Sequence, residues 1–243
     1  MRLSELLSAM GEGSRMNAET PIHDHSRDRA ISSLEYDSRH VGTGSAFFAI
    51  PGEHTDGHLY IQQAIERGAA AVFCERSSAQ TSAPADSSAQ TTSSTPSAHP
   101  QPVFIEVENC RIALSRASAA FFKNPGDELL IIGVTGTDGK SSTVSFLHQL
   151  LEDCSIPAGF ISTVSIQTGD RTYDNTLRQS TPEAPDIHRF LRRMLDAGKQ
   201  AAIVEATSHG LSDKTARLYS LSYDGAIFTN IDHEHLDFHG SFE

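Results

Sequence analysis

A glycine-rich stretch with a lysine carries the clearest chemistry in this sequence. It reads Gly136-Thr137-Asp138-Gly139-Lys140-Ser141-Ser142 and lies between an apolar run that ends at Val134 and a segment of helical character. Glycines let the backbone bring successive N–H groups toward phosphate oxygens, the lysine adds a mobile cation, and the following hydroxyl can bind Mg²⁺. The common phosphate-loop pattern would place glycine at Val134, so this loop is a variant. We predict that residues 136–142 bind a nucleoside triphosphate, with a plain strand-to-helix turn as the alternative.

A carboxylate and a group of histidines also follow apolar runs. Glu205 comes directly after Ala202-Ile203-Val204, where a carboxylate is costly unless a metal ion or hydrogen bonds compensate it. We predict Glu205 as a Mg²⁺ ligand, directly or through water, with a helix or turn cap as the alternative. Further along lie His233, His235 and His239. This run is compatible with the zinc ligands of a binuclear hydrolase, with His235 alone as a metal ligand, or with histidines that only form hydrogen bonds.

Composition limits the classes of protein that this chain can represent. It has 243 residues, 38% of them hydrophobic, which fits one or two soluble globular domains. The formal net charge of -12 argues against a general binder of nucleic acid or of anionic membranes. The three cysteines show no metal-binding or disulfide spacing. No apolar stretch is long enough to span a bilayer and the start does not resemble a secretion signal, so we expect a cytoplasmic protein.

The second half of the chain alternates between predicted strands and helices. Strands are expected at 129–135, 158–161, 201–205 and 225–229, with helices at about 141–153 and 184–197. Apolar strands separated by helices predict a mainly parallel sheet with both faces covered, and ligand-binding groups gather at the carboxyl ends of such strands. The glycine-rich loop, the segment after Glu205 and the histidine run each follow a predicted strand. We therefore expect one pocket to contain all three.

The first half contains a smaller α/β pattern that a low-complexity segment interrupts. Strands are expected at 46–50, 70–74 and 103–107, and helices at 59–68 and 110–122. Residues 77–101 are dominated by Ser, Thr, Ala, Gln and Pro. They are predicted to be a disordered surface insertion whose deletion leaves folding intact. The turn-forming segment 123–127 predicts a boundary between a domain at 1–124 and a domain at 125–243.

Several motifs occur in an order that resembles the Mur ligase family. The glycine-rich loop is followed by Ser180-Thr181-Pro182-Glu183, by Glu205-Ala206-Thr207-Ser208-His209-Gly210-Leu211, and by Phe228-Thr229-Asn230 with His235-Leu236-Asp237-Phe238-His239-Gly240. Nearer the N-terminus, three motifs are similar to the uridine-nucleotide-binding domain of that family: Tyr36-Asp37-Ser38-Arg39, Phe47-Phe48-Ala49 and Gly52-Glu53-His54-Thr55-Asp56-Gly57-His58. The resemblance extends over nearly all of the chain outside residues 77–101.

The resemblance implies an α/β fold in which an N-terminal uridine-nucleotide-binding domain precedes a P-loop-type, mainly parallel-sheet ATP-binding domain. It also implies an ATP-dependent amide ligase of peptidoglycan precursor synthesis, with ATP and Mg²⁺ as cofactors. The carboxylate of UDP-N-acetylmuramoyl-L-alanyl-D-glutamate would attack the γ-phosphate of ATP to give an acyl phosphate, and the amine of a diamino acid would then displace phosphate. The branch of the family that adds a terminal dipeptide is the alternative. Neither nucleic acid nor a membrane is expected as a partner.

The same resemblance implies roles for individual residues. Lys140, Glu205 and His235 are implied in catalysis, with Ser141 and Glu205 on one Mg²⁺ ion and His235 on a second. Residues 136–142 are implied in ATP binding. The residues implied in substrate binding are Tyr36, Ser38, Glu53, His54 and Thr55 for the uridine nucleotide, and Gln179, Ser180, Thr181, Thr207 and Arg217 for the muramoyl peptide.

The resemblance also implies what would lie beyond the end of this sequence. Family members carry a lysine, used as a carbamate to hold the second Mg²⁺, a short way beyond the motif at 235–240. The remaining central strands and a third domain that binds the amino acid follow it. This sequence stops at Glu243, so we expect a truncated central domain, no C-terminal domain, and nucleotide binding without completed ligation. A metal-dependent hydrolase that uses residues 233–239 and a catalytically silent nucleotide-binding module are the other hypotheses.

Overall fold

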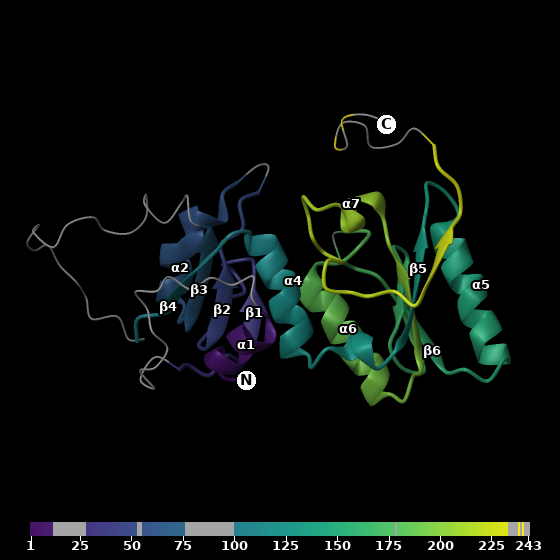
Figure 1. Ribbon diagram of the computed structural model, residues 1–243, viewed down its shortest axis with the longest axis horizontal. Coiled ribbons are helices and arrows are strands. Elements are labelled where there is room, and N and C mark those ends of the chain that lie inside the picture. Colours follow the sequence, from purple (N-terminus) through teal and green to yellow (C-terminus); the bar gives the residue numbers. More distant parts are fainter. Residues whose placement is uncertain are drawn as a thin grey trace, which may run out of the picture. The chain divides into compact units, whose positions relative to one another are not determined.

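The computed structural model describes residues 1–11, 28–52, 55–75, 100–177, 179–232, 238 and 240. These residues fold into two compact units, Met1–Phe121 and Phe122–Glu243, each with a sheet of its own and helices packed on it (Figure 1). The predicted site residues Glu53, His54 and His235 lie outside the described residues, as do His233, His239 and most of the predicted insertion at 77–101. No helix in the described ranges combines the length and the apolar character that a membrane crossing requires.

The first unit is built on a four-stranded sheet in which all neighbouring strands are parallel. The strands lie side by side in chain order: β1 (Ser33–Glu35), β2 (Ser45–Phe48), β3 (Ala71–Glu75) and β4 (Val103–Val107). The helices are α1 (Leu3–Ala9), the 3₁₀ helix η2 (Gly57–Tyr60), α2 (Ile61–Glu66) and α4 (Cys110–Phe121). Parallel neighbours require a crossover between successive strands, and η2 and α2 supply the one from β2 to β3.

Alternation along the strands divides the core of this unit between the two faces of its sheet. Phe48 and Phe73 belong to the cluster that includes α1 and α4, and their rings stack with centroids 4.3 Å apart. Phe47 and Val72 belong to the other cluster, which includes α2. Since successive side chains of a strand point to opposite faces, every apolar side chain of β2 and β3 can be buried on one face or the other.

The second unit has a six-stranded sheet with the order β10-β5-β9-β6-β7-β8. Four strands are parallel: β10 (Gly225–Phe228), β5 (Leu130–Thr135), β9 (Ala201–Glu205) and β6 (Ala158–Ile161). β7 (Ser165–Gln167) and β8 (Thr172–Asp174) continue the sheet as antiparallel strands. The helical elements are η3 (Pro125–Asp127), α5 (Lys140–Asp153), α6 (Ala184–Asp196) and the short α7 (Ser208–Leu211).

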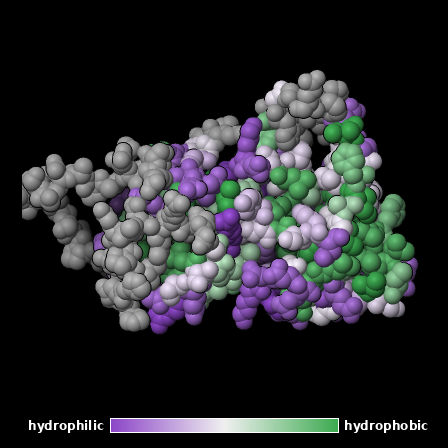
Figure 2. Space-filling model, in the orientation of Figure 1, coloured by the Kyte–Doolittle hydropathy of each residue, from purple (hydrophilic) through white to green (hydrophobic). Residues whose placement is uncertain are grey.

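α5 and α6 cover opposite faces of this sheet (Figure 1). α6 buries Leu191 and Met194 in one core cluster, and α5 buries Val144 in the other. The outer face of α5 is apolar as well, because Phe146 is 70% exposed and Leu150 is 59% exposed. Figure 2 shows apolar side chains gathered on the α5 side of the second unit. The helix therefore presents apolar groups both to the core and to solvent.

The predicted fold class, α/β with a mainly parallel sheet in the second half, is confirmed. The strands predicted at 103–107, 158–161 and 201–205 coincide with β4, β6 and β9, and the other predicted strands and helices differ by no more than about two residues at an end. Four features were not predicted: α1, β1, α7 and the β7–β8 hairpin. β1, β7 and β8 have three residues each, which is too few to show an alternating pattern.

Candidate functional site

Four parallel strands of the second unit end at the same edge of its sheet. β5 leads into the glycine-rich loop, β9 ends at Glu205, β6 leads into Thr163, and β10 leads into Thr229 and Asn230. Because the order is β10-β5-β9-β6, the loop lies between the end of β10 on one side and the end of β9 on the other. The topology therefore brings together the glycine-rich loop and Glu205, two of the three motifs that were expected to share a site.

The loop owes its shape to two glycines. Gly136 has a φ of +131° and Gly139 a φ of +81°, values that residues with a side chain rarely adopt. A Cβ at Gly136 would lie 2.1 Å from Thr229 Oγ1, so the close approach of the segment after β10 also excludes a side chain there. Lys140 begins α5, and its Nζ donates to the carbonyl oxygen of Gly136 at 2.8 Å and to that of Thr137. The lysine side chain thus folds back over the loop.

Residues 229–232, which we call the loop brace, hold the first half of the loop. The Asn230 carbonyl accepts from the Thr137 N–H at 3.0 Å, and Asn230 Oδ1 accepts from the Asp138 N–H at 2.9 Å. Thr229 Oγ1 donates to the Asp138 carbonyl at 2.7 Å, and the Asp232 N–H donates to Thr137 Oγ1 at 2.9 Å. The N–H groups of residues 137 and 138 are therefore used within the protein. The first N–H groups of α5, which have no partner inside the helix, are the donors suited to an anion.

Ser141 and Glu205, predicted as ligands of one metal ion, are in direct contact. Ser141 Oγ donates to Glu205 Oε2 at 2.8 Å. Glu205 is only 2% exposed, and Thr163 supplies two more hydrogen bonds, from its N–H to Oε2 at 2.9 Å and from Oγ1 to Oε1 at 2.8 Å. A hydroxyl oxygen that donates its hydrogen keeps its lone pairs, and Mg²⁺ prefers such oxygens together with carboxylates. The chemistry of these donors therefore fits a Mg²⁺ ion.

A second polar cluster begins at the backbone of Glu205. Thr181 is fully buried, and its Oγ1 lies 3.3 Å from the Glu205 carbonyl oxygen and 2.8 Å from Thr207 Oγ1. Thr207 is the N-cap of α7, where its Oγ1 accepts from the Gly210 N–H at 3.2 Å. Two predicted substrate-binding threonines are thus held beside the predicted metal ligand.

Arg217 joins the same cluster through an ion pair. Its Nε donates to Glu183 Oε1 at 3.0 Å, and its Nη1 donates to the Thr181 carbonyl at 3.2 Å. The side chains of Arg217 and Glu183 are 14% and 8% exposed, so the pair is largely withdrawn from solvent. Gln179 and Ser180, also predicted to bind substrate, lie just before Thr181 in the chain, and Ser180 is exposed.

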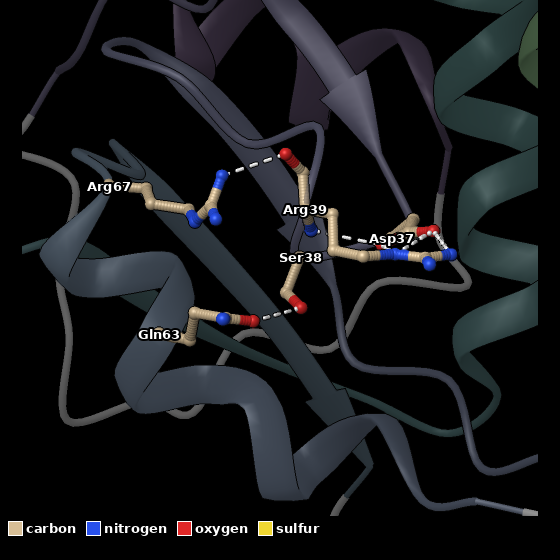
Figure 3. Close-up of polar contacts among 5 residues, drawn as sticks. All are labelled: Asp37, Ser38, Arg39, Gln63 and Arg67. Carbon is tan, nitrogen blue, oxygen red and sulfur yellow. Dashed lines mark hydrogen bonds and ion pairs between the residues drawn. The ribbon is translucent and has the colours of Figure 1, made fainter.

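In the first unit, predicted nucleotide-binding residues lie in the segment between β1 and β2 (Figure 3). Ser38 is buried and donates to Gln63 Oε1, on α2, at 2.6 Å. On either side of it, Asp37 and Arg39 form an ion pair, and Arg67 Nη1 donates to the Arg39 carbonyl at 2.8 Å. Hydrogen bonds from Arg39 lower the pKa of Asp37 to about 2. These contacts connect the segment to α2 through Gln63 and to Arg67, the residue that follows α2.

The remaining predicted residues of the first unit lie at the surface. Tyr36 is exposed, and Thr55, which is also exposed, has its Oγ1 3.2 Å from the hydroxyl of Tyr60. Their part in nucleotide binding stays a prediction, as it does for Glu53 and His54.

The metal-dependent hydrolase hypothesis rests on histidines outside the described residues. Within the part of the chain that the structure describes, no three His, Cys, Asp or Glu side chains converge on one metal-sized site. The hydrolase hypothesis therefore gains no support from the described residues, and the second metal position at His235 stays a prediction.

Thr163 and Asn230 are among the residues of the site that received no role from the sequence. Thr163 belongs to no motif, and only its place after the strand predicted at 158–161 could have pointed to it. Asn230 stands in the motif Phe228-Thr229-Asn230, but its contact with Asp138 spans 92 residues. Such a contact follows from strand order, which a motif does not specify.

Comparisons with known proteins match both units. A family model described as the Mur ligase middle domain matches residues 134–243, and one described as the Mur ligase family catalytic domain matches residues 30–122. A curated relative from Roseiflexus sp. (strain RS-1), named UDP-N-acetylmuramyl-tripeptide synthetase, is 41% identical over 243 residues. The match covers 100% of this chain and 43% of that relative, so the chain spans less than half of the relative's length.

Two solved structures show the same fold. That of UDP-N-acetylmuramoyl-L-alanyl-D-glutamate--2,6-diaminopimelate ligase matches with a TM-score of 0.60 and 22% identity, over 87% of this chain and 38% of that one. That of MurF ligase from Thermotoga maritima in complex with ADP matches with a TM-score of 0.51 and 21% identity, over 88% of this chain and 40% of that one.

Proposed function

Because the chain belongs to the Mur ligase family, we propose that it forms the nucleotide-binding parts of an ATP-dependent ligase of peptidoglycan precursor synthesis. The proposed reaction adds a diamino acid to UDP-N-acetylmuramoyl-L-alanyl-D-glutamate through an acyl phosphate. The tripeptide synthetase from Roseiflexus, 41% identical, supports this branch over the branch that adds a terminal dipeptide. The proposed setting is the cytoplasm, with small-molecule substrates and neither nucleic acid nor a membrane as a partner.

The observation that carries the proposal is the contact between Ser141 and Glu205 beside the glycine-rich loop. A buried carboxylate that accepts a hydrogen bond from the hydroxyl after the loop lysine provides two oxygen donors for Mg²⁺ next to the place where phosphates would bind. Bound Mg²⁺ would neutralise negative charge on the phosphate oxygens of ATP. We assign Ser141 and Glu205 to hold it.

The loop would bind the phosphates through Lys140 and the first N–H groups of α5. The Lys140 ammonium rests on two carbonyl oxygens, and its flexible side chain can exchange them for phosphate oxygens, which carry more negative charge. The helix dipole adds positive potential at the same point. In an acyl-phosphate mechanism, these groups hold the γ-phosphate for attack and stabilise the charge that develops on its oxygens.

The polar cluster around Thr181 is the proposed site for the peptide part of the substrate. Arg217 uses two of its five N–H donors on Glu183 and Thr181, so it has others with which to bind a substrate carboxylate. Thr181 and Thr207 would contribute hydroxyl groups. In this arrangement, the attacking carboxylate is held on the Glu205 side of the loop, next to the γ-phosphate.

Calorimetric titration of the purified chain with Mg²⁺ and a non-hydrolysable ATP analogue tests the proposal. Replacing Lys140 by alanine should weaken binding about 10- to 100-fold, because a hydrogen bond to a charged group contributes about 1.5–3 kcal/mol. Lys199→Ala is the matched control, because it also removes one lysine charge from the second unit. Lys199 lies two residues before the start of β9, whereas Glu205 is at the other end of that strand.

Titration with UDP separates the two parts of the proposal. UDP affinity should stay the same in both lysine variants, because the proposed uridine site lies in the first unit. The ATP part is wrong if the unaltered chain does not bind the Mg²⁺–analogue complex, or if Lys140→Ala binds it as tightly as Lys199→Ala does.

A further inference from the structure

Thr163 makes the most telling contacts that the proposed function does not use. We infer that Thr163 is a positioning residue, which fixes the Glu205 carboxylate in the orientation that accepts a divalent cation. The inference rests on the proposed function, because it takes Ser141 and Glu205 as the cation site. It extends that proposal to a residue on a third strand end, after β6.

Thr163 directs both of its polar hydrogens to the same carboxylate. Its N–H donates to Glu205 Oε2 at 2.9 Å, and its Oγ1 donates to Glu205 Oε1 at 2.8 Å. Oε2 also accepts from Ser141 Oγ at 2.8 Å, whereas Thr163 is the one donor to Oε1 among the described residues. Two hydrogen bonds from one residue to both oxygens fix the plane of the carboxylate, which a single hydrogen bond does not do.

The turn that holds Thr163 is itself fixed by Ser162. Ser162 is buried; its Oγ donates to the Ser165 carbonyl at 2.9 Å and accepts from the Ser165 N–H at 3.1 Å. The Ser162 N–H donates to the same Ser165 carbonyl at 2.9 Å. Because these bonds set the backbone between β6 and β7, the Thr163 N–H points to Glu205 before any ligand binds. The carboxylate is therefore preorganised from the β6 side.

Ser141 and Thr163 have different roles because they contact Glu205 from different elements. Ser141 stands directly after the loop lysine, so it contacts Glu205 from the side of the glycine-rich loop. Thr163 binds the carboxylate from the end of a different strand, so it need not leave when a cation arrives. Thr163 thus stabilises Glu205 in the cation-bound as well as in the free form, and it acts through Glu205 without contacting the cation.

Binding of Mn²⁺, measured by electron paramagnetic resonance with a non-hydrolysable ATP analogue present, tests the inference without any turnover. Thr163→Val has nearly the same shape as threonine but lacks the hydroxyl, and it keeps the N–H bond. We expect it to weaken Mn²⁺ binding about 10-fold, at the low end of the effect of losing an outer partner of a metal ligand. Thr163→Ser restores the hydroxyl and should bind Mn²⁺ like the unaltered chain.

The double variant Thr163→Val/Glu205→Gln distinguishes positioning from a general structural effect. If Thr163 acts through Glu205, Thr163→Val should have no further effect on Mn²⁺ affinity once Glu205 is replaced. With EDTA in place of metal, Thr163→Val and the unaltered chain should bind the analogue with the same affinity. If the substitution distorted the glycine-rich loop, this affinity would fall.

The outcomes separate this inference from the proposed function. Absence of Mn²⁺ binding by the unaltered chain with the analogue would overturn both. Metal binding that is equal in Thr163→Val and the unaltered chain would overturn only the role of Thr163. So would a Thr163→Ser variant that binds as weakly as Thr163→Val, because the hydroxyl would then not be the cause.

Discussion

Two buried polar side chains of the second unit differ in the number of hydrogen bonds that offset the cost of their burial. Glu205 is 2% exposed and accepts three hydrogen bonds. His188, on α6, is also 2% exposed, but its Nδ1 has no hydrogen-bond partner within the described residues. Burial disfavours the charged imidazolium and lowers the pKa of His188 from 6.5 to about 4. The histidine is therefore neutral in the folded chain at neutral pH.

The lowered pKa of His188 predicts a loss of stability in mild acid. Above pH 6.5 the side chain is neutral in both the folded and the unfolded chain, so the full stability is present. As the pH falls from 6.5 toward 4, only the unfolded chain takes up the proton, which favours unfolding. Between pH 7 and pH 5, urea unfolding should show a loss of about 2 kcal/mol that His188→Leu does not show.

A substitution in the same core without a titratable group provides the control for this measurement. Leu191, also on α6, is fully buried, and Leu191→Ala should lower the unfolding free energy but leave its pH dependence as it is in the unaltered chain. If His188→Leu loses as much stability between pH 7 and pH 5 as the unaltered chain, protonation of His188 is not the cause.

At the residue scale, sequence reasoning located the site better than it described the contacts. It placed Lys140, Ser141 and Glu205 near one another because each stands after a predicted strand, and the structure joins Ser141 to Glu205 directly. It did not find Thr163, because a threonine in a short turn has no distinctive spacing. Which residue donates hydrogen bonds to a buried carboxylate depends on which strands are neighbours in the sheet. The alternation of strands and helices along the sequence does not determine that order.

At the scale of elements, the pairing of β3 with β4 argues against the expectation that deleting residues 77–101 leaves folding intact. The two strands are parallel and adjacent, with Ala71 opposite Val103 and Glu75 opposite Val107. The chain must therefore return from the end of β3 to the start of β4, about 13 Å along the sheet at about 3.3 Å per residue. Deleting residues 77–101 would leave two residues, whose three Cα–Cα steps reach about 11 Å at most. Complete deletion is therefore not compatible with this pairing.

A shortened connection should nevertheless be tolerated. Replacing residues 77–101 by twelve residues of glycine and serine leaves a connection long enough for a crossover between parallel strands, which takes about a dozen residues or more. We expect the thermal unfolding midpoint of this variant to stay close to that of the unaltered chain, whereas complete deletion should unfold the first unit. A native midpoint after complete deletion would contradict the parallel pairing.

The elements that sequence reasoning found and those that it missed differ in length and burial. β9 and α6 were predicted because a run of four apolar residues before Glu205 and a long amphipathic helix give clear patterns. β8 was missed because all three of its residues are exposed, so no apolar pattern marks it. The hairpin that β7 and β8 form depends on pairing with β6, which is a tertiary contact.

At the scale of the whole molecule, the outer face of α5 is the feature that most affects behaviour in solution. Phe146 and Leu150 are one helical turn apart, and both are exposed. In the described residues, β10 pairs with β5 alone, and it carries an exposed Phe228. Exposed apolar side chains that are neighbours favour association between molecules, which a net charge of -12 opposes over longer distances.

Replacing Phe146 and Leu150 together by glutamine should reduce self-association without loss of stability. Both side chains are mostly in solvent, so the change in unfolding free energy should stay within about 0.5 kcal/mol for each. Sedimentation velocity over a range of protein concentrations measures the association. Leu59→Gln is the control, because Leu59 is 76% exposed but lies in η2 of the first unit. Association that persists in the double variant would mean that the α5 face is not responsible.

The loop brace also sets when the glycine-rich loop can take its shape. Asn230 and Asp138 are 92 residues apart in the chain, so during synthesis the loop leaves the ribosome long before the residues that give it shape. Contacts of this range form late, because the loss of chain entropy on closing so long a segment must first be offset by other contacts. A nascent chain that has not reached residue 230 lacks the hydrogen bonds that occupy the N–H groups of residues 137 and 138. The glycine-rich loop thus acquires its braced shape only when residues 229–232 dock on it, after β5, β6 and β9 have already been synthesised.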